Sequence, residues 1–127
     1  MELRQNTSQS ITVGPVLGKI TRLADPLIPI SNALLSQCTY ARLIRNSGTS
    51  VSVGARTWYA VPDCAGFYTF PIAPSDVNTL GSLYLCVYNQ STWERPVVME
   101  FEVISQNMWD AKYNNVLLSV EQSAQKG

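Results

Sequence analysis

The fold is decided by the stretch from Gly66 to Phe101, which reads GFYTFPIAPSDVNTLGSLYLCVYNQSTWERPVVMEF. Residues 67–70 are aromatic or β-branched and lie between a glycine and Pro71, so they predict a short strand that ends at the proline. Residues 74–81 are rich in turn formers and predict a corner. There a hydroxyl or acidic side chain can cap one helical turn, and Gly81 can close the turn with a positive φ.

Strict alternation follows the corner. Residues 83–88 place two leucines and a valine on one side and two tyrosines and a cysteine on the other. Polar residues 89–92 interrupt the pattern, and residues 97–104 resume it with Val, Met, Phe and Val on one side. The two runs therefore predict neighbouring strands of an antiparallel sandwich, each with one face toward the core.

Shorter β-prone runs precede this stretch. They cover residues 11–13, 39–45, 50–54 and 56–61. Asn46-Ser47-Gly48 predicts a hairpin between the second and third runs, because Asn and Gly tolerate positive φ. Two prolines predict an extended connection at 25–30, and 31–37 is compatible with a helical turn or a loop. About seven to nine short strands with frequent turn signals are typical of an all-β sandwich.

The chain divides into three parts. We expect a polar amino-terminal arm at 1–10, a β-sandwich domain at 11–113 and a carboxy-terminal extension at 114–127. Ser105 can cap a short helical turn near the end of the domain. The polar arm and a late apolar run at 116–120 suit exchange between subunits, by addition of a strand to an exposed sheet edge.

The amino-acid composition limits the kinds of partner that the chain can bind. The 127 residues suit one domain, and only 14% of them are charged, against about 25% in ordinary soluble domains. So few charges favour a protein that covers part of its surface with a partner. The nine basic and nine acidic residues cancel, which argues against a nucleic-acid-binding face. We find no apolar run typical of a signal peptide or membrane span, and we expect synthesis in the cytoplasm.

The chain has few residues of the types that form catalytic or metal-binding sites. The chain has no histidine and three cysteines, Cys38, Cys64 and Cys86, with no C-x-x-C pair. Triads that need histidine and the common four-ligand zinc sites are therefore excluded within one chain. Buried, unreactive thiols are the simplest interpretation, and a disulfide between Cys38 and Cys86 stays open. No glycine-rich phosphate loop is found, and we predict no catalytic, metal-binding or cofactor-binding residues.

The acidic residues have structural interpretations. Glu100 and Glu102 are two residues apart on one face of a predicted strand, which is typical of a solvated outer face. The alternative, a carboxylate pair of a glycan hydrolase, fits that geometry poorly. Asp63 and Asp76 lie in predicted turns, where aspartate commonly accepts hydrogen bonds from local amides.

The tryptophans are candidates for partner contacts. Trp58 is expected in the core beside Tyr59. Trp93 lies in a predicted hairpin tip, where folding back onto the sheet and anchoring a partner are both open. Trp109, spaced for contact with Tyr113, can cap one end of the sandwich or dock on a neighbour. The predicted contact residues are Trp93, Trp109, Tyr113, Val116, Leu117 and Leu118.

Five segments carry a resemblance to a known family. They are Thr12-Val13-Gly14-Pro15, Gly66-Phe67-Tyr68-Thr69, the corner from Asp76 to Leu83, the strand from Pro96 to Val103, and Trp109-Asp110. Together they resemble a small immunoglobulin-like β-sandwich in virion proteins of tailed bacteriophages and prophages. Val77-Asn78 and Trp109 depart from the pattern of that family, and residues 114–127 match nothing in it.

The resemblance implies a structural role and no catalysis. It implies a virion protein assembled in the host cytoplasm, either a capsid decoration (cement) protein or a tail or neck accessory protein. The expected partners are the major capsid protein or other virion proteins, and further copies of the chain. The alternative is a host-recognition module that binds surface carbohydrate, with Tyr88, Asn89, Trp93 and Glu94 as the platform. We predict that the protein is not an enzyme.

Overall fold

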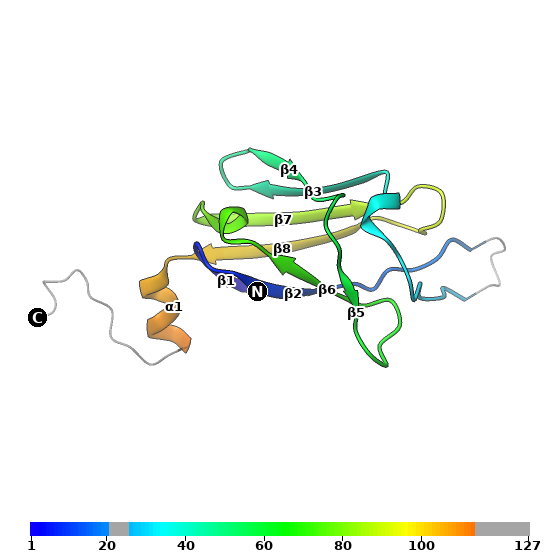
Figure 1. Cartoon of the computed structure of the whole chain (residues 1–127), viewed down its shortest axis with the longest axis horizontal. Helices are drawn as coiled ribbons and strands as arrows, with labels where there is room; N and C mark the ends of the chain where they lie inside the picture. Colours follow the sequence, from blue (N-terminus) through cyan, green and yellow to red (C-terminus); the bar gives the residue numbers. More distant parts are fainter. Residues whose placement is uncertain (21–25, 114–127) are drawn as a thin grey trace, which may run out of the picture.

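The computed structural model describes residues 1–20 and 26–113, which form two β-sheets around one hydrophobic core (Figure 1). The five-stranded sheet has the order β1 (Glu2–Arg4), β8 (Val97–Ile104), β7 (Gly81–Tyr88), β3 (Tyr40–Arg45) and β4 (Ser50–Ser52). The three-stranded sheet has the order β2 (Gln9–Val13), β6 (Tyr68–Ile72) and β5 (Tyr59–Ala60). The predicted two-layered all-β fold is confirmed.

The chain alternates between hairpins and crossings. The hairpins β3–β4, β5–β6 and β7–β8 each stay within one sheet and are antiparallel. The chain changes sheet four times: between β1 and β2, between β2 and β3, between β4 and β5, and between β6 and β7. Strand β1 pairs with β8 in parallel, with Leu3 opposite Val103.

The core follows the predicted alternation. In β7, Leu83, Leu85 and Val87 are buried, and in β8, Phe101 and Val103 are buried. Leu83 lies opposite Phe101 in the register of the two strands. Both sheets therefore turn their aliphatic faces inward, as period-two patterning requires for a sandwich with one solvated side on each sheet.

Two glycines hold the turns that the sequence predicted. Gly48 has φ of +89° in the β3–β4 turn, where its N–H donates to the carbonyl of Arg45 at 2.9 Å. Gly81 has φ of +104° at the start of β7. A short 3-10 helix, η2 (Pro74–Val77), forms the corner before it. Both glycines adopt a backbone conformation that residues with a β-carbon rarely take.

The prediction that Pro71 ends its strand is wrong, because β6 continues through Pro71 to Ile72. Pro71 lies opposite Ser10 of β2, while the other neighbour, β5, reaches only as far as Thr69 in the register. Proline has no backbone N–H to donate to a neighbouring strand. This is tolerated at Pro71, because β5 has already ended and no described strand lies on that side of β6 to accept the hydrogen bond. The short length of β5 also means that little of the predicted run 56–61 is a strand.

The amino-terminal residues differ from the expected polar arm. Residues 2–4 form the edge strand β1, and the leucine in its centre is buried against the core. Gln9 turns its side chain back onto Arg4, accepting from its N–H at 3.2 Å and donating to its carbonyl at 2.8 Å. The N–H of Gln5 donates to the carbonyl of Ile104 at 2.9 Å and that of Asn6 to the carbonyl of Val77 at 3.1 Å, so the chain stays attached as it turns from one sheet into the other.

A stack of aromatic rings fixes the connection before β3. Trp58 stacks on Tyr68, with ring centroids 4.6 Å apart. The indole N–H of Trp58 donates to the carbonyl of Ala33 at 2.8 Å, and the hydroxyl of Tyr68 accepts from the N–H of Ala33 and donates to the carbonyl of Ile30. The ambiguous segment 31–37 resolves into an extended stretch and a 3-10 turn, η1 (Leu35–Gln37).

Candidate interaction surfaces

Trp93 folds back into the core, which is one of the two alternatives that the sequence left open. It is only 2% exposed, and its ring stacks on Trp58 at 6.3 Å between centroids. Its backbone N–H donates to Asn89, which closes the β7–β8 loop over the end of the sandwich. The ring is therefore not accessible to a partner in this fold, and the carbohydrate platform expected around it loses its central ring.

Trp109 and Tyr113 lie on α1 (Gln106–Tyr113), at one end of the sandwich beyond β8 (Figure 1). The hydroxyl of Ser105 accepts from the N–H of Met108 at 3.2 Å, so the predicted cap is confirmed. The rings of Trp109 and Tyr113 contact each other at 4.3 Å between centroids, and Tyr113 is exposed. The other predicted contacts, Val116, Leu117 and Leu118, lie outside the described residues.

Ion pairs attach α1 to the edge strand β1. Arg4 pairs with Asp110 at 3.3 Å, and Glu2 pairs with Lys112 at 2.7 Å. Glu2 also accepts a hydrogen bond from the hydroxyl of Tyr113 at 2.7 Å. The hydrogen bond from Lys112, followed by that from Tyr113, lowers the pKa of Glu2. No side chain of α1 is fully buried, although Trp109 and Ala111 are partly so, and these polar contacts are a main part of what holds the helix against β1.

Asp76 supports the corner before β7 and forms no part of an open site. It is buried, and it forms a two-point ion pair with Arg56, at 2.5 and 2.7 Å. It also accepts the N–H of Ala73 at 2.8 Å, as the turn interpretation predicted. Burial raises the pKa of Asp76, but these hydrogen bonds outweigh burial and leave its pKa below the ordinary value. Arg56 in turn lies over the ring of Phe70.

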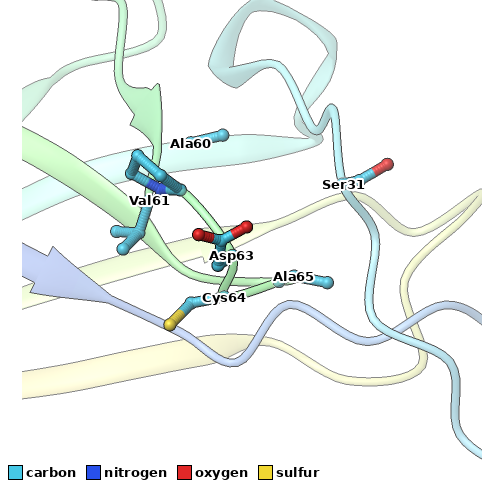
Figure 2. A pocket seen from close by; sticks show the side chains of 8 residues that line it. Ser31, Ala60, Val61, Asp63, Cys64 and Ala65 are labelled. Carbon is cyan, nitrogen blue, oxygen red and sulfur yellow. The ribbon is translucent and has the colours of Figure 1, made fainter.

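A shallow depression beside the β5–β6 loop collects Asp63, Cys64 and Ser31, and its volume is about 500 Å³. Figure 2 shows the carboxylate of Asp63 and the thiol of Cys64 pointing in different directions, with the hydroxyl of Ser31 turned away from both. The three side chains do not converge on one point, so the depression lacks the geometry of a nucleophile with its base.

The three cysteines are free, so no disulfide joins Cys38 to Cys86. Burial raises the pKa of the Cys38 thiol to about 11, and burial also raises the pKa of Cys86. Thiols with raised pKa values are weak nucleophiles at neutral pH. Cys38 donates to the carbonyl of Leu34, and Cys86 lies in the middle of β7.

The carboxylates of Glu100 and Glu102 lie on the exposed face of β8, as their spacing predicted. Glu100 accepts a hydrogen bond from the hydroxyl of Tyr84 at 3.4 Å. In the described part of the chain, no three His, Cys, Asp or Glu side chains are grouped so that they could hold a metal ion. Across residues 1–20 and 26–113, no helix has the length and apolar character to span a membrane.

The outer face of the five-stranded sheet is the most distinctive surface. We call it the tyrosine face and define it by Tyr40, Ile44, Tyr84, Cys86, Tyr88 and Val98. Tyr40 and Val98 are 40% and 60% exposed, and Tyr84 is 36% exposed. The register places Tyr40 beside Tyr88, and their rings contact each other at 5.9 Å between centroids. Such aromatic and aliphatic side chains on an outer sheet face are typical of protein-protein contacts.

The outer face of the three-stranded sheet is more polar than the tyrosine face. In β2 and β6 the outward positions are occupied by Ser10, Thr12, Thr69 and Pro71, and Tyr59 is the exposed ring beside them. Hydroxyl groups of this kind are readily solvated, so the two sides of the sandwich present different chemistry. The alternation in the sequence predicted that Tyr84, Cys86 and Tyr88 share one face of a strand. None of the residues of the tyrosine face was among the predicted contact residues.

No family model, no curated protein and no solved structure matches this chain.

Proposed function

We propose that the chain is a structural virion protein of a tailed bacteriophage that acts by protein-protein contact as a capsid decoration (cement) protein. The observation that carries the proposal is the tyrosine face, an apolar and aromatic sheet surface on a chain with only 14% charged residues. A surface of this kind is suited to docking on another protein. A tail or neck accessory protein would use the same surface on another part of the particle.

Three of the segments that resemble the virion family lie along one continuous part of the fold, from β6 through η2 and β7 to β8. The Gly66–Thr69 segment enters β6, the corner holds η2, and the Pro96–Val103 segment forms most of β8. The first lies in the three-stranded sheet, and the other two lead into the sheet that carries the tyrosine face.

The strand order supports the immunoglobulin-like part of the proposal. In variable-type immunoglobulin sandwiches, strands G, F, C and C′ lie side by side in one sheet, and strands B, E and D lie in the other. Here β8, β7, β3 and β4 lie side by side in one sheet, and β2, β6 and β5 form the other. The parallel edge strand β1 occupies the position of an initial strand that joins the sheet of the last strand.

The test is to locate the protein in the intact particle. Averaged cryo-electron microscopy of phage particles should show one sandwich-sized density at each repeat of the capsid lattice. Particles that lack the protein should lose resistance to heat and regain it when purified protein is added. Density at the neck or tail alone would assign the accessory role, and absence of the protein from purified particles would refute a virion role.

A further inference from the structure

We propose that the tyrosine face binds the same face of a second copy of this chain, with a two-fold axis that runs along β7. This dimer goes beyond the proposed function and is a state of the free protein, because a copy whose tyrosine face is buried in the dimer cannot use that face on a particle at the same time. Three features of the face carry the inference: its side chains, its charges and its size.

The side chains form continuous rows across three strands. One row joins Ile44, Tyr84 and Glu100, and the next joins Arg42, Cys86 and Val98. The pair Tyr40 and Tyr88 extends the apolar surface beyond the second row. Tyrosine gives large contact area with few rotatable bonds, and it is enriched among the residues that dominate binding energy in interfaces.

The charges on the face are separated by the central strand. Arg42 lies on β3, Glu100 and Glu102 lie on β8, and β7 between them carries no charged residue. The guanidinium of Arg42 donates to the hydroxyl of Ser50, at 3.3 and 3.2 Å, and has no carboxylate partner within residues 1–20 and 26–113. Glu100 likewise has no cationic partner there, so both charges are available to a second molecule.

The positions of these charges select the symmetry axis. An axis along β7 turns the second copy so that its β8 lies over β3 of the first. Arg42 of each copy then lies over the row of Val98 in the other, one row or about 7 Å along the strand from Glu100, which is within reach of the long arginine side chain. The pair occurs twice. An axis across the strands would instead place β3 over β3, with like charges in the same column. Opposite charges fix the register of an interface, and like charges penalise the wrong one.

The size of the face suits a weak, reversible dimer. With eight residues in β7 at about 3.4 Å each and about 4.8 Å between neighbouring strands, the three strands of the face offer a platform of about 27 by 10 Å. A platform of this size is typical of transient interfaces, which bury less than about 1,200 Å² in total. We therefore expect a dimer whose population depends on concentration and falls at high salt.

The experiment is a charge exchange, read by analytical ultracentrifugation of the full chain between about 1 and about 200 μM. Wild type should sediment as a monomer-dimer equilibrium. Arg42→Glu and Glu100→Arg should each weaken dimerisation by about tenfold or more, because each creates two repulsive pairs. The double variant Arg42→Glu/Glu100→Arg should restore the dimer to within about threefold of wild type, since it exchanges the charges and keeps the pairs.

Thr12→Glu is the matched control, because Thr12 is an exposed strand position on the opposite face. It should leave the dimer unchanged, and the melting temperature of each variant shows that the fold is intact. A wild type that stays monomeric throughout the range overturns the proposal, and so does a dimer that neither single change weakens. Failure of the double variant to recover overturns the axis along β7. A monomer that is nevertheless found in particles would leave the proposed function standing without the dimer.

Discussion

The side chain of Asn46 fills the space beside Gly81 that a β-carbon would need. A β-carbon built on Gly81 would lie 2.7 Å from the amide nitrogen of Asn46, whereas one on Gly48 would meet nothing within 4 Å. Both glycines have positive φ, so replacing either one strains the backbone and lowers the free energy of unfolding. Replacing Gly81 must also displace the side chain of Asn46.

Gly81→Ala should therefore destabilise the protein more than Gly48→Ala does. We expect about 1 kcal/mol for Gly48→Ala and about 2–4 kcal/mol for Gly81→Ala, measured by urea unfolding at neutral pH. Equal losses at the two positions would mean that Asn46 moves aside at no cost.

The ion pair between Asp76 and Arg56 is the main buried polar contact described. Asp76→Asn removes the charge that Arg56 bonds at two points and should cost about 2–3 kcal/mol, less than for a fully buried pair because Arg56 is partly exposed. Asp63→Asn is the control, since Asp63 is exposed with φ of +62° and asparagine tolerates that conformation. It should change the free energy of unfolding by less than about 0.5 kcal/mol.

The lowered pKa of Asp76 predicts how stability depends on pH. The folded chain binds this proton less readily than the unfolded chain, so the contribution of Asp76 is complete above the ordinary pKa of 3.8 and is lost as pH falls through the lower folded value. Wild type should therefore lose more stability than Asp76→Asn between pH 7 and about pH 3, in urea unfolding. Parallel losses in the two proteins would contradict this assignment.

At the scale of elements, α1 is held on the sandwich mainly by polar contacts, whereas β8 is held by apolar contacts with the core. The double variant Arg4→Ala/Lys112→Ala removes both cations that join α1 to β1. We expect amide hydrogen exchange in residues 106–113 to accelerate by about tenfold while the exchange of β7 and β8 stays unchanged. About 1 M NaCl should have a similar effect on wild type.

Arg95→Ala is the control for this prediction, because it removes a positive charge at an exposed position away from α1. It should leave the exchange of α1 as in wild type. If α1 exchanges at the same rate in the double variant, then the helix is held by contacts other than these ion pairs.

At the scale of the whole molecule, the stacked rings couple the two sheets. Trp58 contacts Tyr68 of β6 in one sheet and Trp93 in the loop that joins two strands of the other. Loss of either sheet should therefore change the environment of these rings. In a Trp109→Phe background, which leaves only the two stacked tryptophans, urea unfolding followed by fluorescence and by far-ultraviolet circular dichroism should give coincident curves.

Separate transitions in that experiment would mean that one sheet unfolds before the other. The Trp109→Phe change itself should leave the midpoint close to that of wild type, because Trp109 lies on α1 outside the core.

The sequence by itself determined β7, β8 and the hairpin between β3 and β4, together with the core face of β7. Alternation placed Leu83, Leu85 and Val87 inside, Asn46-Ser47-Gly48 formed its hairpin, and Gly81 took its positive φ. These features depend on side-chain period and on backbone sterics within a few residues, so they can be read from local sequence. The same alternation put Tyr84 and Tyr88 outside, although it did not show that Tyr40 and Val98 would join them.

Only the tertiary structure decided which distant segments meet. The pairing of β1 with β8, the passage of β6 through Pro71 and the burial of Trp93 against Trp58 all depend on neighbours far away in the chain. Local sequence describes Trp93 as a ring at a loop tip, and whether that ring is buried depends on a hydrophobic surface supplied by other elements. The tyrosine face is likewise a property of three strands in register, because the hydrophobic effect acts on surfaces that only the assembled sheet possesses.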